Sequence, residues 1–194
     1  MPLPLRIDVI DNGGQWTHRE WRMLRDIEVD TQIVSNDTPL ASLRKDLDGL
    51  LLSGGAARIG LTGELGACGE YLSLDIPILG ICAGHQFMAI HYGGSACPAS
   101  HPEFGAVEIT TVNESILFQN TPMVQQAFTS HNDEVDVVPE GFIVTATSDT
   151  CSVQAMECLS SHRFGVQFHP EVTHTEYGSR IIANFVEYCQ TQSS

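Results

Sequence analysis

The chain has 194 residues, of which 42% are hydrophobic and 17% are charged. This balance is typical of a globular chain rather than a disordered one, and the length predicts one domain over residues 1–194. With 24 acidic against 9 basic side chains, the formal net charge of -15 opposes non-specific binding to nucleic acid or to an anionic membrane surface.

The amino-terminal residues lack the basic stretch, long apolar segment and cleavage site of a secretory signal, and no apolar run is long enough to cross a bilayer. We therefore expect a cytoplasmic protein. The cysteines are scattered without a CxxC pair, which favours buried thiols over a zinc site or a disulfide framework. They are Cys68, Cys82, Cys97, Cys151, Cys158 and Cys189.

The first third of the chain alternates between strand and helix patterns. LRIDVID, residues 5–11, is a β-branched apolar run that ends in a glycine-containing loop, so it predicts a strand. Apolar residues at helical spacing predict a helix from Thr17 to Asp26, and Thr17 followed by Glu20 resembles a capping box. VDTQIVSND, residues 29–37, predicts a second strand.

Two further apolar runs end at glycine-rich segments. LDGLLLSGG, residues 47–55, has the pattern of a strand that is buried on both faces and leads into a functional loop. Residues 76–81 repeat this pattern and pass sharply into a helix that ends near Gly93. The alternation predicts an α/β fold with a mostly parallel central sheet flanked by helices.

The second half of the chain has closely spaced strand candidates with turn signals between them, so we expect an antiparallel extension of the sheet. The candidates are AVEITTV (106–112), VDVVPEGFIVTATS (135–148), SVQAMEC (152–158) and FGVQFH (164–169). RIIANFVEYC, residues 180–189, predicts a closing helix with Ile181, Phe185 and Tyr188 or Cys189 on one face.

Cys82 is the candidate nucleophile. In GICAGHQ, residues 80–86, its thiol sits where a strand turns into a helix, between Gly80 and Gly84. This pattern resembles a nucleophile elbow, which exposes a side chain beside backbone N–H groups. The amino terminus of the helix favours a thiolate there. A cysteine in an apolar strand is also well explained as a small core residue, and a second motif is needed to decide.

That second motif is FGVQFHPEV, residues 164–172. His169 and Glu171 follow an apolar strand and are separated by Pro170, so a base and the residue that orients it can be presented together. Each residue alone would be read as structural or solvated. His85 lies near Cys82 but has no further metal ligands at a recognised spacing, so we interpret it as structural and expect no metal.

Together, GICAGHQ and FHPEV resemble the class I glutamine amidotransferases, in which a cysteine is followed much later by His, any residue, Glu. The resemblance implies a flavodoxin-like fold and a catalytic triad of Cys82, His169 and Glu171. It also implies an oxyanion hole formed by the backbone N–H groups of Gly55 and Ala83. The family usually has proline after these glycines, whereas this chain has Ala56 and Ala57.

Four more stretches resemble the separate glutaminase subunits of archaeal GMP synthetases. They are DNGGQWTHREWRMLRD (11–26), SHNDEV (130–135), PEGF (139–142) and HPEVTHTEYG (169–178). This resemblance implies that Gln86, Ser130 and His131 hold the amino-acid end of glutamine. It also makes Asp133 and His174 candidates for partner contact or activation, although both could be surface residues that satisfy local turns.

The resemblance implies glutamine hydrolysis with no cofactor in this subunit, and a partner ATP-pyrophosphatase subunit that carries ATP and Mg and aminates XMP. The sequence has no phosphate-binding GxxxxGK motif of its own, which agrees with that division of labour. The alternatives are an amidotransferase subunit of another synthetase, such as anthranilate synthase, and a catalytically silent regulatory domain of the same fold. A cysteine peptidase of related fold is a further rival.

Overall fold

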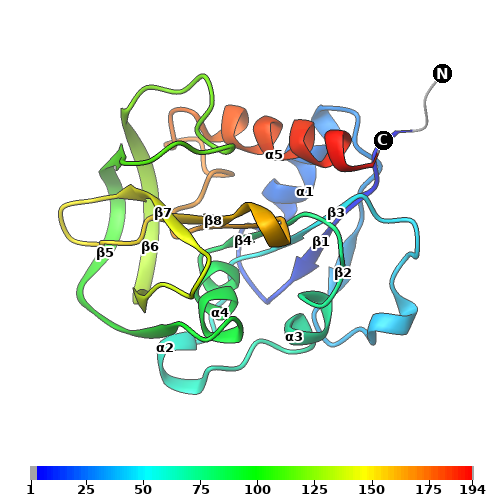
Figure 1. Cartoon of the computed structure of the whole chain (residues 1–194), viewed down its shortest axis with the longest axis horizontal. Coiled ribbons are helices and arrows are strands. Elements are labelled where there is room, and N and C mark those ends of the chain that lie inside the picture. Colours follow the sequence, from blue (N-terminus) through cyan, green and yellow to red (C-terminus); the bar gives the residue numbers. More distant parts are fainter. Residues whose placement is uncertain (1–3, 194) are drawn as a thin grey trace.

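The structure is a computed structural model and describes residues 4–193. Its strands form a nine-stranded sheet with the order β2-β1-β3-β4-β9-β8-β7-β5-β6 (Figure 1). The strands are β1 (Ile7–Asp11), β2 (Ile33–Ser35), β3 (Gly49–Leu52), β4 (Ile78–Ile81), β5 (Ser95–Thr111), β6 (Val124–Val137), β7 (Ile143–Thr147), β8 (Ala155–Cys158) and β9 (Arg163–Val166). The α-helices are α1 (Thr17–Asp26), α2 (Ile59–Thr62), α3 (Cys68–Tyr71), α4 (Ala83–His91) and α5 (Gly178–Gln192). Short 3-10 helices span Leu40–Ser42 and Leu159–Ser161.

The parallel part of the sheet comprises β2, β1, β3, β4 and β9. Every residue of β3, β4 and β9 is buried, because helices cover both faces. Helices α1 and α5 pack on one face, and α3 and α4 pack on the other (Figure 1). The expected fold class is therefore confirmed, and the carboxyl ends of the parallel strands meet at one edge, where ligand sites form in open α/β sheets.

The antiparallel extension is also present, but its strands differ from the expected ones. β5 and β6 form a ribbon much longer than the predicted 106–112 segment. Residues 135–148 do not form one strand, because the chain turns at Gly141, where φ is +83°, and separates the end of β6 from β7. SHNDEV lies inside β6 rather than in a loop, and its alternate residues His131, Asp133 and Val135 are buried.

The prediction of a capping box at the start of α1 is wrong. Trp16 occupies the N-cap position, and no side chain caps the helix there. The Thr17 hydroxyl instead donates to a carboxylate oxygen of Asp11, 2.9 Å away. Glu20 does not reach back to the helix amino terminus but lies in the interior, with 1% of its surface exposed. The helix itself spans the predicted residues, so the periodicity was informative where the cap pattern was not.

The other helices follow the sequence pattern closely. α4 ends at His91, ahead of Gly93, whose φ of +92° no longer suits a helix. In α5, Ile181, Phe185 and Cys189 are buried against the sheet as expected. The described part of the chain contains no helix long and apolar enough to cross a membrane.

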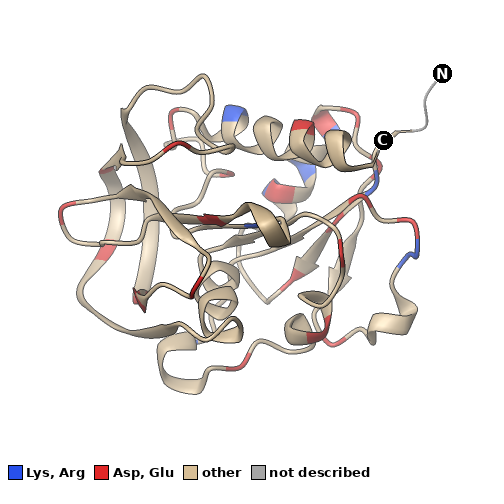
Figure 2. Ribbon diagram, viewed as in Figure 1, with Lys and Arg blue, Asp and Glu red and all other residues tan. Residues whose placement is uncertain are grey.

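Charge is unevenly distributed along the chain. No lysine or arginine occurs between Arg58 and Arg163, so the basic side chains lie near the ends of the sequence, on α1 and α5 among other places (Figure 2). Strands β5 and β6 therefore contain acidic residues, and neither they nor β7 contains a lysine or arginine (Figure 2).

Candidate active site

The corner between β4 and α4 presents Cys82. Its φ of +50° and ψ of -103° place a non-glycine residue in a sparsely populated conformation. A Cβ on Gly80 would lie 2.6 Å from the Gly84 carbonyl carbon, and one on Gly84 would lie 2.4 Å from the Leu52 carbonyl oxygen. Both glycines are therefore required by close packing, and the elbow predicted from GICAGHQ is confirmed as a structural feature.

The segment after β9 presents His169 and Glu171. Nδ1 of His169 lies 2.6 Å from Oε1 of Glu171, and both side chains are buried. The backbone holds the histidine from both sides: its N–H donates to the Phe128 carbonyl, and its own carbonyl accepts from the Thr175 hydroxyl at 2.6 Å. The imidazole orientation is thus determined by β6 and by the turn before α5.

The charge state of His169 follows from these neighbours. Burial lowers its pKa, but the Glu171 charge and hydrogen bonds to Cys82 and Glu171 outweigh burial and raise the pKa from 6.5 to about 10. The ring is therefore an imidazolium near neutral pH, placed between the carboxylate and the thiol. An imidazolium beside a cysteine favours the thiolate, which is the nucleophilic form.

The glycine loop after β3 lies close to both groups. The position of a Cβ built on Gly54 is 3.1 Å from Cε1 of His169 and 3.5 Å from the Cβ of Cys82. A Cβ on Gly55 would lie 2.4 Å from the Asn12 carbonyl oxygen, so only glycine fits against the loop that follows β1. Gly55 and Ala83, the expected oxyanion-hole residues, line the same cavity as Cys82.

Arg58 and Asp133 anchor the far end of this loop. The guanidinium makes three hydrogen bonds of 2.7–3.1 Å to the Asp133 carboxylate, which also accepts the Gly60 N–H. Asp133 is 3% exposed, so its carboxylate faces the protein rather than solvent. The loop lacks the family's usual proline but is tied to β6 instead, and sequence reasoning did not anticipate this role of Arg58.

A chain of buried amides leads to the nucleophile. Nε2 of Gln86 donates to the Asp133 carbonyl at 2.6 Å and to Oε1 of Gln167 at 3.0 Å, and Nε2 of Gln167 lies 3.6 Å from the Cys82 sulfur. Both N–H groups of Gln86 are thus used internally, and only its oxygen remains to meet a ligand. Sequence reasoning missed Gln167, whose only signal was its place two residues before His169.

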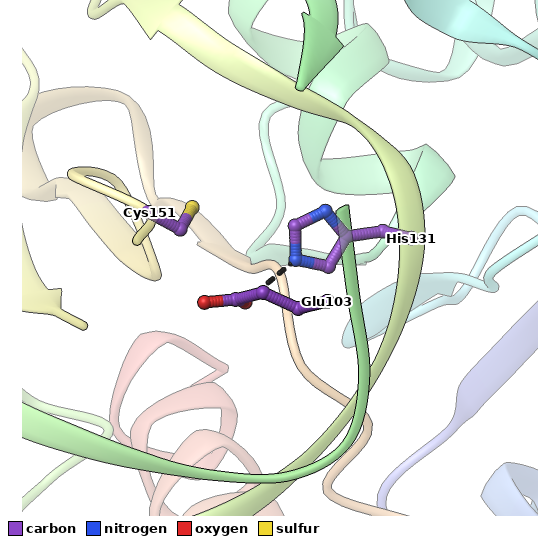
Figure 3. A group of neighbouring side chains, drawn as sticks. All are labelled: Glu103, His131 and Cys151. Atoms are coloured by element: carbon purple, nitrogen blue, oxygen red, sulfur yellow. Dashed lines mark hydrogen bonds and ion pairs between the residues drawn. The ribbon is translucent and has the colours of Figure 1, made fainter. Parts of the chain in front are cut away.

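His131 forms a buried ion pair with Glu103 (Figure 3). Its Nε2 lies 2.8 Å from Oε2 of Glu103, and its Nδ1 lies 2.9 Å from the Asp133 carbonyl. Both partners are acceptors, so both ring nitrogens carry protons. Burial raises the Glu103 pKa, but hydrogen bonds from His131, Thr150, Ser148 and Gln154 outweigh it and lower that pKa to about 2.

Figure 3 also places Cys151 beside this pair, and the possible ligand atoms of the three residues lie within 4.8 Å of one another. A metal ion would have to displace the hydrogen bonds that already satisfy His131 and Glu103. Burial also raises the Cys151 pKa to about 12, which disfavours the thiolate that a metal binds. We therefore interpret the group as an ion pair that holds β6 in place.

The cavity over Cys82 has a volume of about 430 Å³. Ser130 and His131 line it, and the Ser130 carbonyl oxygen lies 3.9 Å from the Cys82 sulfur. His174 is exposed and lies outside it, with its ring 5.9 Å from that of Phe128. The candidate substrate residues are thus gathered around Cys82, whereas His174 is left at the surface.

His85 does not line the cavity. It is fully buried, its Nε2 lies 3.2 Å from the Val153 carbonyl, and burial lowers its pKa to about 3, so the ring is neutral. A Cβ on Gly165 would meet the His85 ring at 2.4 Å. These contacts agree with the structural role expected for this histidine.

The sequence matches the family model described as glutamine amidotransferase class-I over residues 8–189. A Thermoplasma acidophilum protein, named as one subunit of glutamine-hydrolyzing GMP synthase, is 46% identical over 187 residues, which cover 95% of this chain and 93% of that protein. The Haloquadratum walsbyi protein of the same name is 45% identical over 185 residues, 95% of this chain and 98% of that one.

Two solved structures superpose on the fold of this chain. A Thermoplasma acidophilum crystal structure, described as that of a putative GMP synthase subunit, superposes with a TM-score of 0.93 at 44% identity, covering 99% of this chain and 97% of that one. A glutamine amidotransferase from Thermotoga maritima, 20% identical, superposes with a TM-score of 0.73 over 98% of this chain and 84% of its own. At that identity the second likeness supports the fold alone.

Proposed function

The chain belongs to the class I glutamine amidotransferases, and from this premise we propose that it is the glutaminase subunit of a two-subunit GMP synthase. It hydrolyses glutamine to glutamate and ammonia, and the ammonia passes to an ATP-pyrophosphatase subunit that aminates XMP to GMP. The shared subunit name among relatives that are 43–46% identical supports this assignment.

The observation that carries the proposal is the buried His169–Glu171 pair, 2.6 Å apart, facing Cys82 in one cavity. In the first half of the reaction, the Cys82 thiolate attacks the side-chain amide carbon of glutamine, and the carbonyl electrons move to oxygen. The N–H groups of Gly55 and Ala83 stabilise the resulting oxyanion. His169 then gives its proton to the amide nitrogen, the carbon–nitrogen bond breaks, and ammonia leaves.

In the second half, a water molecule gives a proton to His169 and attacks the γ-glutamyl thioester carbon. A second oxyanion forms, the carbon–sulfur bond breaks, and glutamate leaves with Cys82 restored as thiolate. Glu171 stays ionised throughout and holds the imidazole with Nδ1–H toward itself, so that Nε2 is the atom that exchanges protons. No cofactor takes part in this subunit, and ATP and Mg act on the partner.

Binding of the amino-acid end of glutamine is assigned to the strand that carries Ser130 and His131, with the Gln86 oxygen beside it. The His131–Glu103 ion pair, 2.8 Å between Nε2 and Oε2, holds this strand to the neighbouring strand β5. Asp133 acts inside this subunit through Arg58, whereas exposed His174 is the candidate for partner contact. A partner seated at His174 would lie against Phe128, whose ring is 5.7 Å from that of Trp16, which in turn contacts His169.

The experiment that tests the proposal measures ammonia release from glutamine by the purified chain, with and without a GMP synthase ATP-pyrophosphatase subunit, ATP and XMP. We expect a low rate for the chain alone and a large rise in kcat in the full mixture, with a smaller change in KM for glutamine. The reason is that docking of the partner would turn the Gly55 N–H toward the oxyanion. Gaining one such donor corresponds to about 2.7–4 kcal/mol of barrier, or roughly a hundred- to a thousandfold in rate.

Two outcomes would separate parts of this proposal. Activation by an anthranilate synthase partner, but not by the GMP synthase partner, would overturn the assignment to GMP synthesis. Full activity of the chain alone would overturn the gating by a partner but leave the glutaminase reaction standing.

A further inference from the structure

Glu20 is a second buried carboxyl group beside the proposed triad. It lies on α1, is 1% exposed, and lines the same cavity as Cys82, His169 and Glu171. The Gly54 N–H lies near its carboxyl group and partly offsets the rise in its pKa. The sequence pattern predicted a helix-capping role for Glu20. The proposed reaction gives this residue no role.

Each of the two glutamates, Glu20 and Glu171, has one buried carboxyl oxygen that lacks a hydrogen-bond donor within the described part of the chain. Oε1 of Glu171 is bound by His169, but Oε2 of Glu171 and Oε2 of Glu20 are both buried without a hydrogen-bond partner among residues 4–193. A buried carboxylate oxygen without a hydrogen-bond donor destabilises the folded protein. Both residues line the same cavity, and two carboxylates cannot supply a donor to each other, whereas one proton shared between them would satisfy both oxygens.

The charges around Glu20 also favour its protonated form. Burial, followed by the charge of Glu171, raises the Glu20 pKa well above its usual value; the His169 charge and the Gly54 N–H lower it, and the Asp11 charge raises it. Glu171 is the natural site of the negative charge, because it is paired with the His169 imidazolium. Glu20 is therefore the group that takes the proton.

We propose that Glu20 is a neutral carboxylic acid that donates a hydrogen bond to Oε2 of Glu171, and so positions the carboxylate that orients His169. Through this hydrogen bond Glu20 would connect α1 to the proposed base, with the Gly54 N–H of the glycine loop nearby. Glu20 is a positioning residue, since it acts on the reacting atoms through Glu171 and His169. This inference rests on the proposed roles of Cys82 and His169.

The test uses the full chain and compares Glu20→Gln, which keeps a neutral donor and an acceptor, with Glu20→Leu, which removes both. Glu157→Gln is the matched control, because Glu157 is another buried glutamate with a raised pKa, bonded to Ser115 and to backbone N–H groups away from the cavity. The probe is the alkylation rate of Cys82 by iodoacetamide, followed by peptide mass spectrometry. Proton NMR of the His169 Nδ1–H signal reports the His169–Glu171 bond directly.

We expect Glu20→Gln and Glu157→Gln to retain the wild-type alkylation rate and Nδ1–H signal. We expect Glu20→Leu to lose about 10-fold in rate, the equivalent of one buried hydrogen bond, and to shift or broaden that signal. Wild-type reactivity in Glu20→Leu, or an equal loss in Glu20→Gln and Glu20→Leu, overturns the proposal.

If Glu20→Leu does not fold, the comparison of wild type with Glu20→Gln decides. Equal rates near neutral pH support a neutral acid at position 20, and a loss in Glu20→Gln overturns it. Since alkylation needs neither glutamine nor a synthetase partner, a failure of the proposed GMP synthase role would leave this measurement interpretable.

Discussion

The side-chain amide of Gln167 lies 3.6 Å from the sulfur of Cys82 and is itself held by Gln86. A hydrogen bond from this amide stabilises the thiolate more than the thiol. We expect Gln167→Leu to slow Cys82 alkylation about 10- to 100-fold, since a hydrogen bond to a charged group contributes about 1.5–3 kcal/mol. Gln167→Glu should be slower still, because a carboxylate repels the thiolate. Equal rates in all three proteins would exclude this role.

Cys82→Ala should abolish glutamine hydrolysis and leave the fold intact, because Cys82 is the thiol that interacts with His169. Ammonia supplied from outside should still support amination of XMP in the complex with the partner. Cys97→Ala is the control, since Cys97 is a half-buried cysteine that does not line the cavity. Ammonia release and thermal unfolding are the measurements. Substantial glutaminase activity in folded Cys82→Ala would remove the proposed mechanism.

Glu171→Gln should lower the His169 pKa from about 10 toward 6.5, because the Glu171 charge is the main influence that raises it. The folded-state pKa lies above the unfolded one, so the charged ring contributes stability that is complete below about pH 6.5 and is lost as the pH rises through about 10. In the variant, this pH-dependent contribution should largely disappear, because the folded and unfolded pKa values become similar. His169 titration by NMR and unfolding between about pH 6 and 10.5 would check this; an unchanged titration would contradict the assigned pair.

The same two residues differ in their expected kinetic effects. Glu171→Gln should reduce turnover less than His169→Ala, because Glu171 orients the base rather than exchanging protons with substrate. Glutamine binding should largely persist in both variants. Equal losses of rate and of affinity would indicate that the pair builds the binding pocket instead.

Acid should weaken the protein through Glu103. Its pKa is lowered to about 2 in the folded state, below the usual 4.5, so its contribution to stability is present above about pH 4.5 and is lost as the pH falls toward 2. Glu103→Gln should remove this part of the acid dependence and lower stability at neutral pH, because His131 loses its counter-charge. Urea unfolding at neutral pH and at about pH 4 and 3 is the measurement. Parallel pH curves for wild type and variant would contradict the buried ion pair.

Arg58 and Asp133 should be coupled. Arg58→Ala leaves a 3% exposed carboxylate with the Gly60 N–H as its remaining donor among these contacts, so we expect a loss in the free energy of unfolding. Asp133→Asn in the same chain should recover part of it, because the buried charge is gone. A double-mutant cycle measures this coupling. Strict additivity would show that the pair does not hold the loop.

The sequence by itself determined the parts of this protein that depend on neighbouring residues. The apolar runs of β3, β4 and β9, the helical spacing of α1 and α5, and the glycines around Cys82 are local patterns, and each corresponds to the observed element. The resemblance to a known family then associated Cys82 with His169 and Glu171. These three residues do lie together, because the carboxyl ends of β4 and β9 are adjacent in the sheet.

Only the tertiary structure decided which polar side chains meet across the fold. Glu20 has the local pattern of a helix-capping residue, yet the packing of α1 on the sheet places it at the cavity that Glu171 also lines. Gln167 contacts Cys82 across 85 positions, and Arg58 contacts Asp133 across 75. Periodicity tells which face of a strand or helix is buried but not which group lies opposite it, because that depends on strand order and helix placement. The hydrogen-bond network that supports the proposed catalytic residues is therefore a property of the folded chain.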